Sequence, residues 1–231
     1  MIPTAVVFDF DGVIANSEPL HLRVFQETLR DMLGIELSVE EYYERYLGFD
    51  DEGAVRAVLA DRGLADGEER VSAIVEDKAK RLPALLMSPQ ILMPGALACV
   101  SRLAASFPLA IASGARRDEI QLVLDARGLA EPFEVIVAAG ETPRGKPFPD
   151  PYERAIALLI DRGRLSPSTR PSQCVAIEDS RWGLTSARQA GLRCVGITSS
   201  YSRDDLAEAD HVIDSLDELT IELLSRLAAP A

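Results

Sequence analysis

Short apolar runs recur along the chain and predict buried parallel strands. They cover residues 5–8, 109–112, 135–137, 175–177 and 194–197. Between the later runs, apolar residues recur at helical spacing, so that strand and helix alternate. This alternation predicts an α/β fold with a doubly wound parallel sheet, that is, a Rossmann-like core.

Residues 16–92 follow a different pattern, because no strand-like run interrupts them. Amphipathic segments near residues 20–33, 39–46, 54–62 and 68–86 predict helices instead. The stretch is long for a simple crossover between neighbouring strands. We therefore expect an inserted helical cap domain at residues 16–92, and an α/β catalytic core made of residues 1–15 and 93–231.

The 231 residues carry a formal charge of −13. Neither nucleic acid nor an anionic membrane is an expected partner, because both bind clustered Lys and Arg. A small anionic substrate is compatible with this charge, since a local cation-rich pocket can hold it. The three cysteines show no metal-ligand spacing, and the first residues lack the pattern of a signal peptide. We expect a cytoplasmic protein.

Two acids follow the first predicted strand. Asp9 and Asp11 come directly after the run at residues 5–8, and Gly12 comes next. If the extended chain persists, strand alternation directs both carboxylates to one side, and Gly12 permits a sharp turn behind them. An exposed pair of loop acids is the alternative interpretation.

A second acid pair, Glu178 and Asp179, ends the strand predicted at residues 175–177. A helix N-cap at Asp179 or Ser180 is the alternative, although capping does not require two adjacent acids. Both pairs together place up to four carboxylates in one crevice, where they repel each other unless they bind a cation or take up protons. An all-oxygen ligand set favours Mg²⁺ over zinc.

The strand predicted at residues 109–112 ends in Ser113 and Gly114, with Arg116 just beyond. A hydroxyl and free backbone N–H groups at the start of a helix suit the oxygens of a phosphate, and Arg116 is a further candidate for phosphate binding. An ordinary helix cap is the alternative.

Lys146 lies in a stretch that almost matches a P-loop. Pro147 stands where that loop needs Ser or Thr, so the match fails. What remains is a lysine presented by rigid prolines before a predicted helix. A solvated surface lysine is the alternative.

Taken in order, the motifs at residues 9–13, 113–114, 146–147 and 178–180 resemble the four signature motifs of the haloacid dehalogenase superfamily. The motif order, the strand ends and the helical insertion agree with its beta-phosphoglucomutase and phosphoglycolate phosphatase branch. The resemblance covers essentially the whole chain.

This resemblance implies a division of roles. Asp9 would attack phosphorus to form an aspartyl-phosphate, while Asp11 would protonate the leaving oxygen and later deprotonate water. Mg²⁺ would be held by the Asp9 carboxylate, the Asp11 backbone carbonyl and Asp179. Glu178 would be a further ligand or a partner of one.

The resemblance also implies that Ser113, the Gly114 N–H and Lys146 hold the phosphoryl oxygens. True dehalogenases of the superfamily lack an acid at the position of Asp11, since a halide leaving group needs no proton. Asp11 therefore favours phosphate chemistry over dehalogenation.

Phosphatases and mutases of this branch share one core and differ in the cap. His21 has the spacing of a cap histidine in beta-phosphoglucomutase and is a candidate substrate contact; a core or surface histidine is the alternative. The loop at residues 47–51 lacks the Lys and Arg with which a mutase holds a second phosphate, and Asp50 and Asp51 would repel it.

We therefore expect a magnesium-dependent phosphatase that hydrolyses a small phosphorylated metabolite, with a phosphosugar mutase as the alternative. A phospho-accepting receiver module shares the acids, hydroxyl and lysine. It is disfavoured, because it would carry its acceptor Asp on a central strand and would not need a cap.

Overall fold

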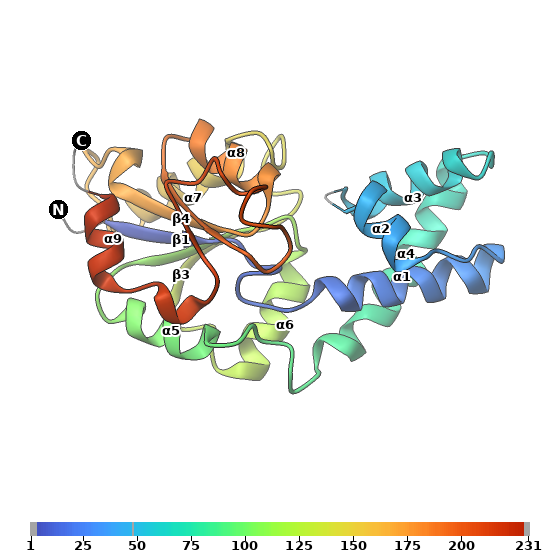
Figure 1. Cartoon of the computed structure of the whole chain (residues 1–231), viewed down its shortest axis with the longest axis horizontal. Helices are drawn as coiled ribbons and strands as arrows, with labels where there is room; N and C mark the ends of the chain where they lie inside the picture. Colours follow the sequence, from blue (N-terminus) through green and yellow to red (C-terminus); the bar gives the residue numbers. More distant parts are fainter. Residues whose placement is uncertain (1–3, 48, 229–231) are drawn as a thin grey trace. The chain divides into compact units, whose positions relative to one another are not determined.

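The computed structural model describes residues 4–47 and 49–228. The chain divides into two compact units, Met1–Asn16 with Pro89–Ala231 and Ser17–Ser88, here named the core unit and the helical unit (Figure 1). The predicted boundaries fall one residue before the first junction and four residues beyond the second. Within the described residues, no helix combines the length and the apolar character needed to cross a membrane.

The core unit is built on a six-stranded, all-parallel sheet in the order β3-β2-β1-β4-β5-β6. The strands are β1 (Ala5–Phe8), β2 (Leu109–Ala112), β3 (Phe133–Val137), β4 (Cys174–Glu178), β5 (Arg193–Ile197) and β6 (His211–Ile213). The strand order reverses direction at β1, which is the topological switch point where such sheets bind ligands. The predicted doubly wound α/β fold is confirmed.

The central strands end within one residue of one another. Phe8, the last residue of β1, lies opposite Ile111 of β2 on one side and Ile177 of β4 on the other. Residues that follow these strands therefore emerge side by side at one edge of the sheet. The edge strand β6 escaped prediction because only Ile213 of its three residues is buried, so it forms no apolar run.

Helices cover both faces of the sheet. On one face, Tyr152 and Leu159 of α7 (Asp150–Asp161) and Leu184 of α8 (Arg181–Gln189) pack in one cluster with Val7 and Ala176 of the strands. Figure 1 shows α5 (Ala96–Ala104) and α6 (Arg117–Arg127) on the opposite side. The core unit also contains η1 (Pro171–Gln173), η2 (Leu216–Glu218) and α9 (Ile221–Leu227).

The helical unit has a hydrophobic core of its own, which confirms an inserted helical domain as part of the fold. Its helices are α1 (Glu18–Leu33), α2 (Val39–Arg45), α3 (Asp51–Asp61) and α4 (Glu68–Leu86). Phe25 and Leu29 of α1, Leu59 of α3 and Ile74 of α4 belong to the cluster that these helices bury. All four helices lie within two or three residues of the amphipathic segments that predict them.

The chain leaves the core unit and returns to it along paired segments. The Asn16 N–H donates to the Ile91 carbonyl at 2.7 Å, and the Met93 N–H donates to the Ile14 carbonyl at 2.9 Å. Ala15 and Leu92 form an antiparallel bridge between them. The two segments that lead to and from the insertion therefore lie side by side within the core unit, and none of the six strands belongs to the insertion.

Candidate active site

Three buried carboxylates meet where β1 and β4 end. Asp9 follows β1, Glu178 is the last residue of β4, and Asp179 comes next. They are 7%, 0% and 5% exposed. One carboxylate oxygen from each lies within 4.8 Å of the other two. The parallel pairing of neighbouring strands β1 and β4 brings these acids together across 169 residues of sequence separation between Asp9 and Glu178.

Lys146 is the cation of this cluster. Its Nζ donates to Asp9 Oδ1 at 2.7 Å and to Glu178 Oε1 at 2.5 Å, and its side chain is only 12% exposed. Burial alone would lower the pKa of Lys146, but Asp9 and Glu178 raise it above its usual value. The lysine therefore stays charged, and the interpretation of Lys146 as a solvated surface residue is wrong.

Glu178 has hydrogen-bond donors on both oxygens. The Tyr152 hydroxyl donates to Oε1 at 2.6 Å and the Ser180 hydroxyl to Oε2 at 3.2 Å. Gly183 lies against the carboxylate, where a Cβ atom would overlap it. Tyr152 was not expected at the site, because it falls on the apolar face of a helix and its sequence signal is that of a core residue.

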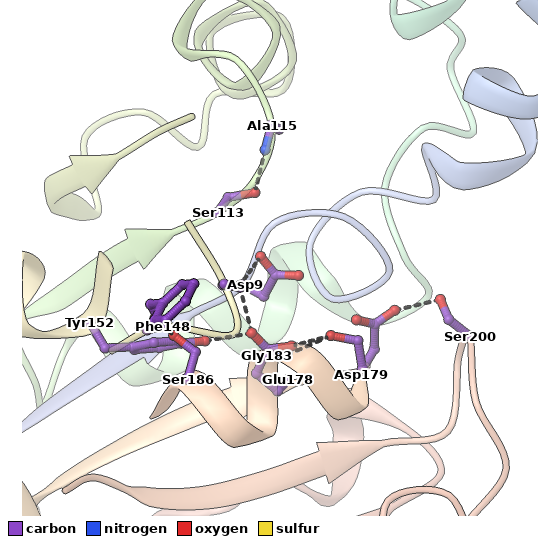
Figure 2. A network of polar contacts seen from close by, with 12 residues as sticks. Asp9, Ser113, Ala115, Phe148, Tyr152, Glu178, Asp179, Gly183, Ser186 and Ser200 are labelled. Atoms are coloured by element: carbon purple, nitrogen blue, oxygen red, sulfur yellow. Dashed lines mark hydrogen bonds and ion pairs between the residues drawn. The ribbon is translucent and has the colours of Figure 1, made fainter. Parts of the chain in front are cut away.

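Asp179 is enclosed by two loops, as Figure 2 shows for Ser200. The Ser200 hydroxyl donates to Asp179 Oδ2, and Gly12 lies so close to the same oxygen that a Cβ atom there would overlap it. Gly12 also has φ 71°, which favours glycine. Burial, followed by the charges of Asp9 and Glu178, raises the pKa of Asp179 well above its usual value.

The cluster carries more negative than positive charge. Three carboxylates face one ammonium, so two negative charges lack a balancing cation within the cluster. Such a buried group binds a cation or takes up protons. The donors are all oxygens, which suits a hard divalent ion, so Asp9, Glu178 and Asp179 form a group that could hold a metal ion.

Comparison with known proteins identifies the family. Residues 3–191 match the family model described as haloacid dehalogenase-like hydrolase. The chain belongs to this family. It is 34% identical to Protein CbbY of Rhodobacter capsulatus, over 96% of this chain and 98% of that protein. It is 26% identical to validoxylamine A 7'-phosphate phosphatase of Streptomyces hygroscopicus subsp. limoneus, over 92% of this chain and 94% of that protein.

A solved structure agrees with this assignment. A variant of CbbY from Rhodobacter sphaeroides, in complex with xylulose-(1,5)bisphosphate, has a TM-score of 0.81 to this chain at 30% identity. The similarity covers 95% of this chain and 96% of that one. It therefore extends over both the core unit and the helical unit of this haloacid dehalogenase-like hydrolase.

Asp11 does not lie in the three-carboxylate cluster. The chain bends at Phe10, after which the backbone of Asp11 bridges to Ala15. The extended conformation on which the alternation rule depends therefore ends with β1. Asp11 is close to Asp9 in sequence, but a turn, not a strand, sets the direction of its side chain.

Ser113 and Gly114 follow β2, at the same edge of the sheet. The Ser113 hydroxyl accepts from the Ala115 N–H at 3.0 Å, and Ser113 is 4% exposed. The N-cap of α6 is Arg116, so the interpretation of Ser113 as a helix cap is wrong. The Arg116 guanidinium donates to both carboxylate oxygens of Asp118 at 3.0 Å.

Helix α8 settles the capping alternative for the second acid pair. Ser180 is its N-cap, and the Ser180 hydroxyl accepts from the Gly183 N–H at 3.0 Å. Asp179 is thus not used as a cap, and its carboxylate is directed into the cluster instead.

His21 lies in the helical unit beside Lys78. His21 Nδ1 is 3.1 Å from Lys78 Nζ, and Lys78 also pairs with Asp51. Burial, and then the Lys78 ammonium, lowers the pKa of His21 to about 3. Lys78 is only 5% exposed and belongs to the buried side of α4. Its signal in the sequence is a charged residue at a helical spacing that is otherwise apolar.

The two acids of the loop at residues 47–51 both have partners within the helical unit. Gly48 lies outside the described residues. Asp50 is the N-cap of α3 and accepts from the Gly53 N–H at 2.8 Å, while Asp51 pairs with Lys78. The helical unit thus places a lysine beside an acid that was expected to repel a phosphate, so this part of the case against a mutase is weakened.

We predict that Gly183→Ala destabilises the protein, although Ala normally stabilises a helix by about 1 kcal/mol relative to Gly. The added Cβ would overlap the Glu178 carboxylate, so we expect a loss of about 1–3 kcal/mol, measured by urea unfolding. Gly145→Ala is the control, since a Cβ there meets nothing within 4 Å. Equal stability of wild type and Gly183→Ala would contradict the tight packing around Glu178.

We also predict that His21 stays neutral between pH 7 and pH 5, because its lowered pKa lies below that range. The measurement is an NMR titration of the imidazole resonances. The chain has two histidines, so a His21→Gln variant assigns the signal. A midpoint near the usual value of 6.5 would show that Lys78 and burial do not act on His21 as described.

Proposed function

We propose that this haloacid dehalogenase-like hydrolase is a magnesium-dependent phosphatase that hydrolyses a small-molecule phosphate monoester through an aspartyl-phosphate on Asp9. The observation that carries the proposal is the Lys146 ammonium, shared by Asp9 and Glu178 within a group of three buried carboxylates. A carboxylate can approach a phosphate dianion only where cations offset the repulsion between them.

In the proposed reaction, Asp9 attacks phosphorus while Asp11 protonates the leaving oxygen, so that an alcohol departs and an aspartyl-phosphate forms. Asp11 then accepts a proton from water, which attacks the same phosphorus. Inorganic phosphate leaves, and the Asp9 carboxylate is regenerated. The position of Asp11 outside the carboxylate cluster is compatible with this role, since its carboxylate is not needed as a metal ligand.

The Asp9 and Asp179 carboxylates and the Asp11 backbone carbonyl are the proposed holders of Mg²⁺. When bound, the ion supplies the positive charge that the cluster lacks and polarises the phosphoryl group. Glu178 has donors on both oxygens, which supports a role in holding Lys146 in place. Ser113 and the Gly114 N–H, with Lys146, are proposed to bind the phosphoryl oxygens.

The substrate is proposed to be a phosphorylated sugar or sugar-like metabolite. The names of the relatives support this class, because CbbY of Rhodobacter sphaeroides was solved with xylulose-(1,5)bisphosphate and the Streptomyces relative is named for validoxylamine A 7'-phosphate. His21 and Arg116 are retained as candidate substrate contacts. The free, buried cysteines fit a reducing compartment, in support of a cytoplasmic location.

We predict that a screen of phosphorylated metabolites, in which phosphate release and isomer formation are measured in parallel, shows phosphate release without isomers. Asp9→Asn should fold and release no phosphate, because the neutral amide oxygen is a much poorer nucleophile than a carboxylate oxygen. Asp125→Asn, an exposed acid of the core unit, is the matched control and should act like wild type.

Two results would overturn the proposal. Interconversion of a hexose 1-phosphate and 6-phosphate with little phosphate release would identify a mutase. Phosphate release by Asp9→Asn at a rate near that of wild type would remove Asp9 as the nucleophile.

A further inference from the structure

The loop that follows β5 reaches the carboxylate cluster from a strand that carries none of the acids. Ser199 and Ser200 stand just beyond the end of β5. The Ser199 hydroxyl donates to the Gly12 carbonyl at 2.6 Å, and the Ser200 hydroxyl donates to Asp179 Oδ2. One short segment thus contacts both the turn after Asp9 and the acid at the end of β4.

The contact on Asp179 distinguishes its two oxygens. Oδ2 accepts the Ser200 hydroxyl and faces Gly12, whose missing side chain leaves room for it. A carboxylate with one oxygen fixed cannot rotate freely, so Oδ1 acquires a defined direction. Hydrogen bonds of this kind, made to a ligand and not to the metal, orient the ligand and raise metal affinity.

The hydrogen bond from Ser200 to Asp179 contributes more in these buried surroundings than it would at the protein surface. Asp179 is 5% exposed, and its other charged neighbours include Asp9 and Glu178, which repel it. Lys146 donates to those two carboxylates. The hydrogen bond that stabilises Asp179 comes instead from the Ser200 hydroxyl, which donates to Oδ2. A buried carboxylate that loses its donor also loses part of its compensation for desolvation.

We propose that Ser200 is a positioning residue for the divalent cation: by holding Asp179 Oδ2, it presents Oδ1 to the ion. The inference rests on the proposed function, because it requires the metal site at Asp9 and Asp179. Ser199 supports the same arrangement by fastening the loop to the Gly12 carbonyl.

The test is the affinity for Mg²⁺ of the full chain, measured by isothermal titration calorimetry. Ser200→Ala should weaken binding by about 10- to 100-fold, the range typical of groups that orient a metal ligand. Ser200→Thr keeps the hydroxyl and should restore most of the affinity. Ser202→Ala is the matched control from the same loop, because Ser202 is exposed and its hydroxyl donates to Asp205, outside the carboxylate cluster, at 2.6 Å.

A second measurement separates positioning from folding. The thermal unfolding midpoint is measured for each variant with and without Mg²⁺, and the stabilisation gained on adding Mg²⁺ should be smaller in Ser200→Ala than in Ser202→Ala, whatever the midpoint of each variant without the ion. Equal losses of affinity in Ser200→Ala and Ser200→Thr would assign the effect to packing of the loop and overturn the proposal.

The Asp179→Asn variant shows whether a negative result refutes only the role of Ser200 or also the proposed metal site. If Asp179→Asn binds Mg²⁺ poorly while Ser200→Ala binds like wild type, the role of Ser200 is refuted and the proposed function stands. If Asp179→Asn also binds like wild type, the metal site is misplaced, and the proposal for Ser200 fails with it.

Discussion

The structure of the site depends on one buried ammonium that is shared by two carboxylates. Lys146 joins Asp9, which follows the first strand of the sheet, to Glu178, which ends the fourth. Breaking a buried ion pair by removal of one partner typically costs about 3–5 kcal/mol, because the other charge is left uncompensated. The loop that carries Lys146 is therefore as important to the site as the strands.

The fold is suited to concentrating this charge. β1 lies between β2 and β4, and all three end within one residue of one another, so the residues beyond them share one edge. Packing then sets the spacing of the acids. Gly12 leaves room for Asp179, and Gly183 leaves room for Glu178. The result is a cluster in which each carboxylate has partners but the group as a whole lacks positive charge, as a site for a divalent cation requires.

Much of the fold can be predicted from the sequence because its strands are buried on both faces. The runs at residues 5–8 and 109–112 coincide with β1 and β2, since every residue in them is buried and apolar. β6 could not be found in this way, because the exposed His211 and the half-buried Val212 leave no buried apolar run. The helices of the inserted unit were visible because each has one apolar face and one polar face.

The site was predictable where acids end an apolar run, as at Asp9 and Asp179, and where a recognisable motif surrounds the residue, as at Lys146. It was not predictable where the pattern hides the polar group. Tyr152 belongs to the buried face of α7, and only the fold brings its hydroxyl to Glu178. The sequence predicts that Asp51 repels a phosphate, because its partner Lys78 lies 27 residues away on another helix. Long-range pairs of this kind follow from the packing of elements, and a single sequence does not encode them in any local spacing.

Nucleophilic attack by Asp9 is tested most sharply by a search for the phosphoryl group on Asp9 itself. The enzyme is mixed rapidly with Mg²⁺ and a substrate that it hydrolyses. The reaction is quenched in acid within one turnover, and the protein is digested for mass spectrometry. We predict that the peptide that contains Asp9 gains the mass of one phosphoryl group, and that the modification appears before inorganic phosphate. Release of phosphate at the full rate, without any phosphorylated form of that peptide, would show that the reaction does not pass through an aspartyl-phosphate on Asp9.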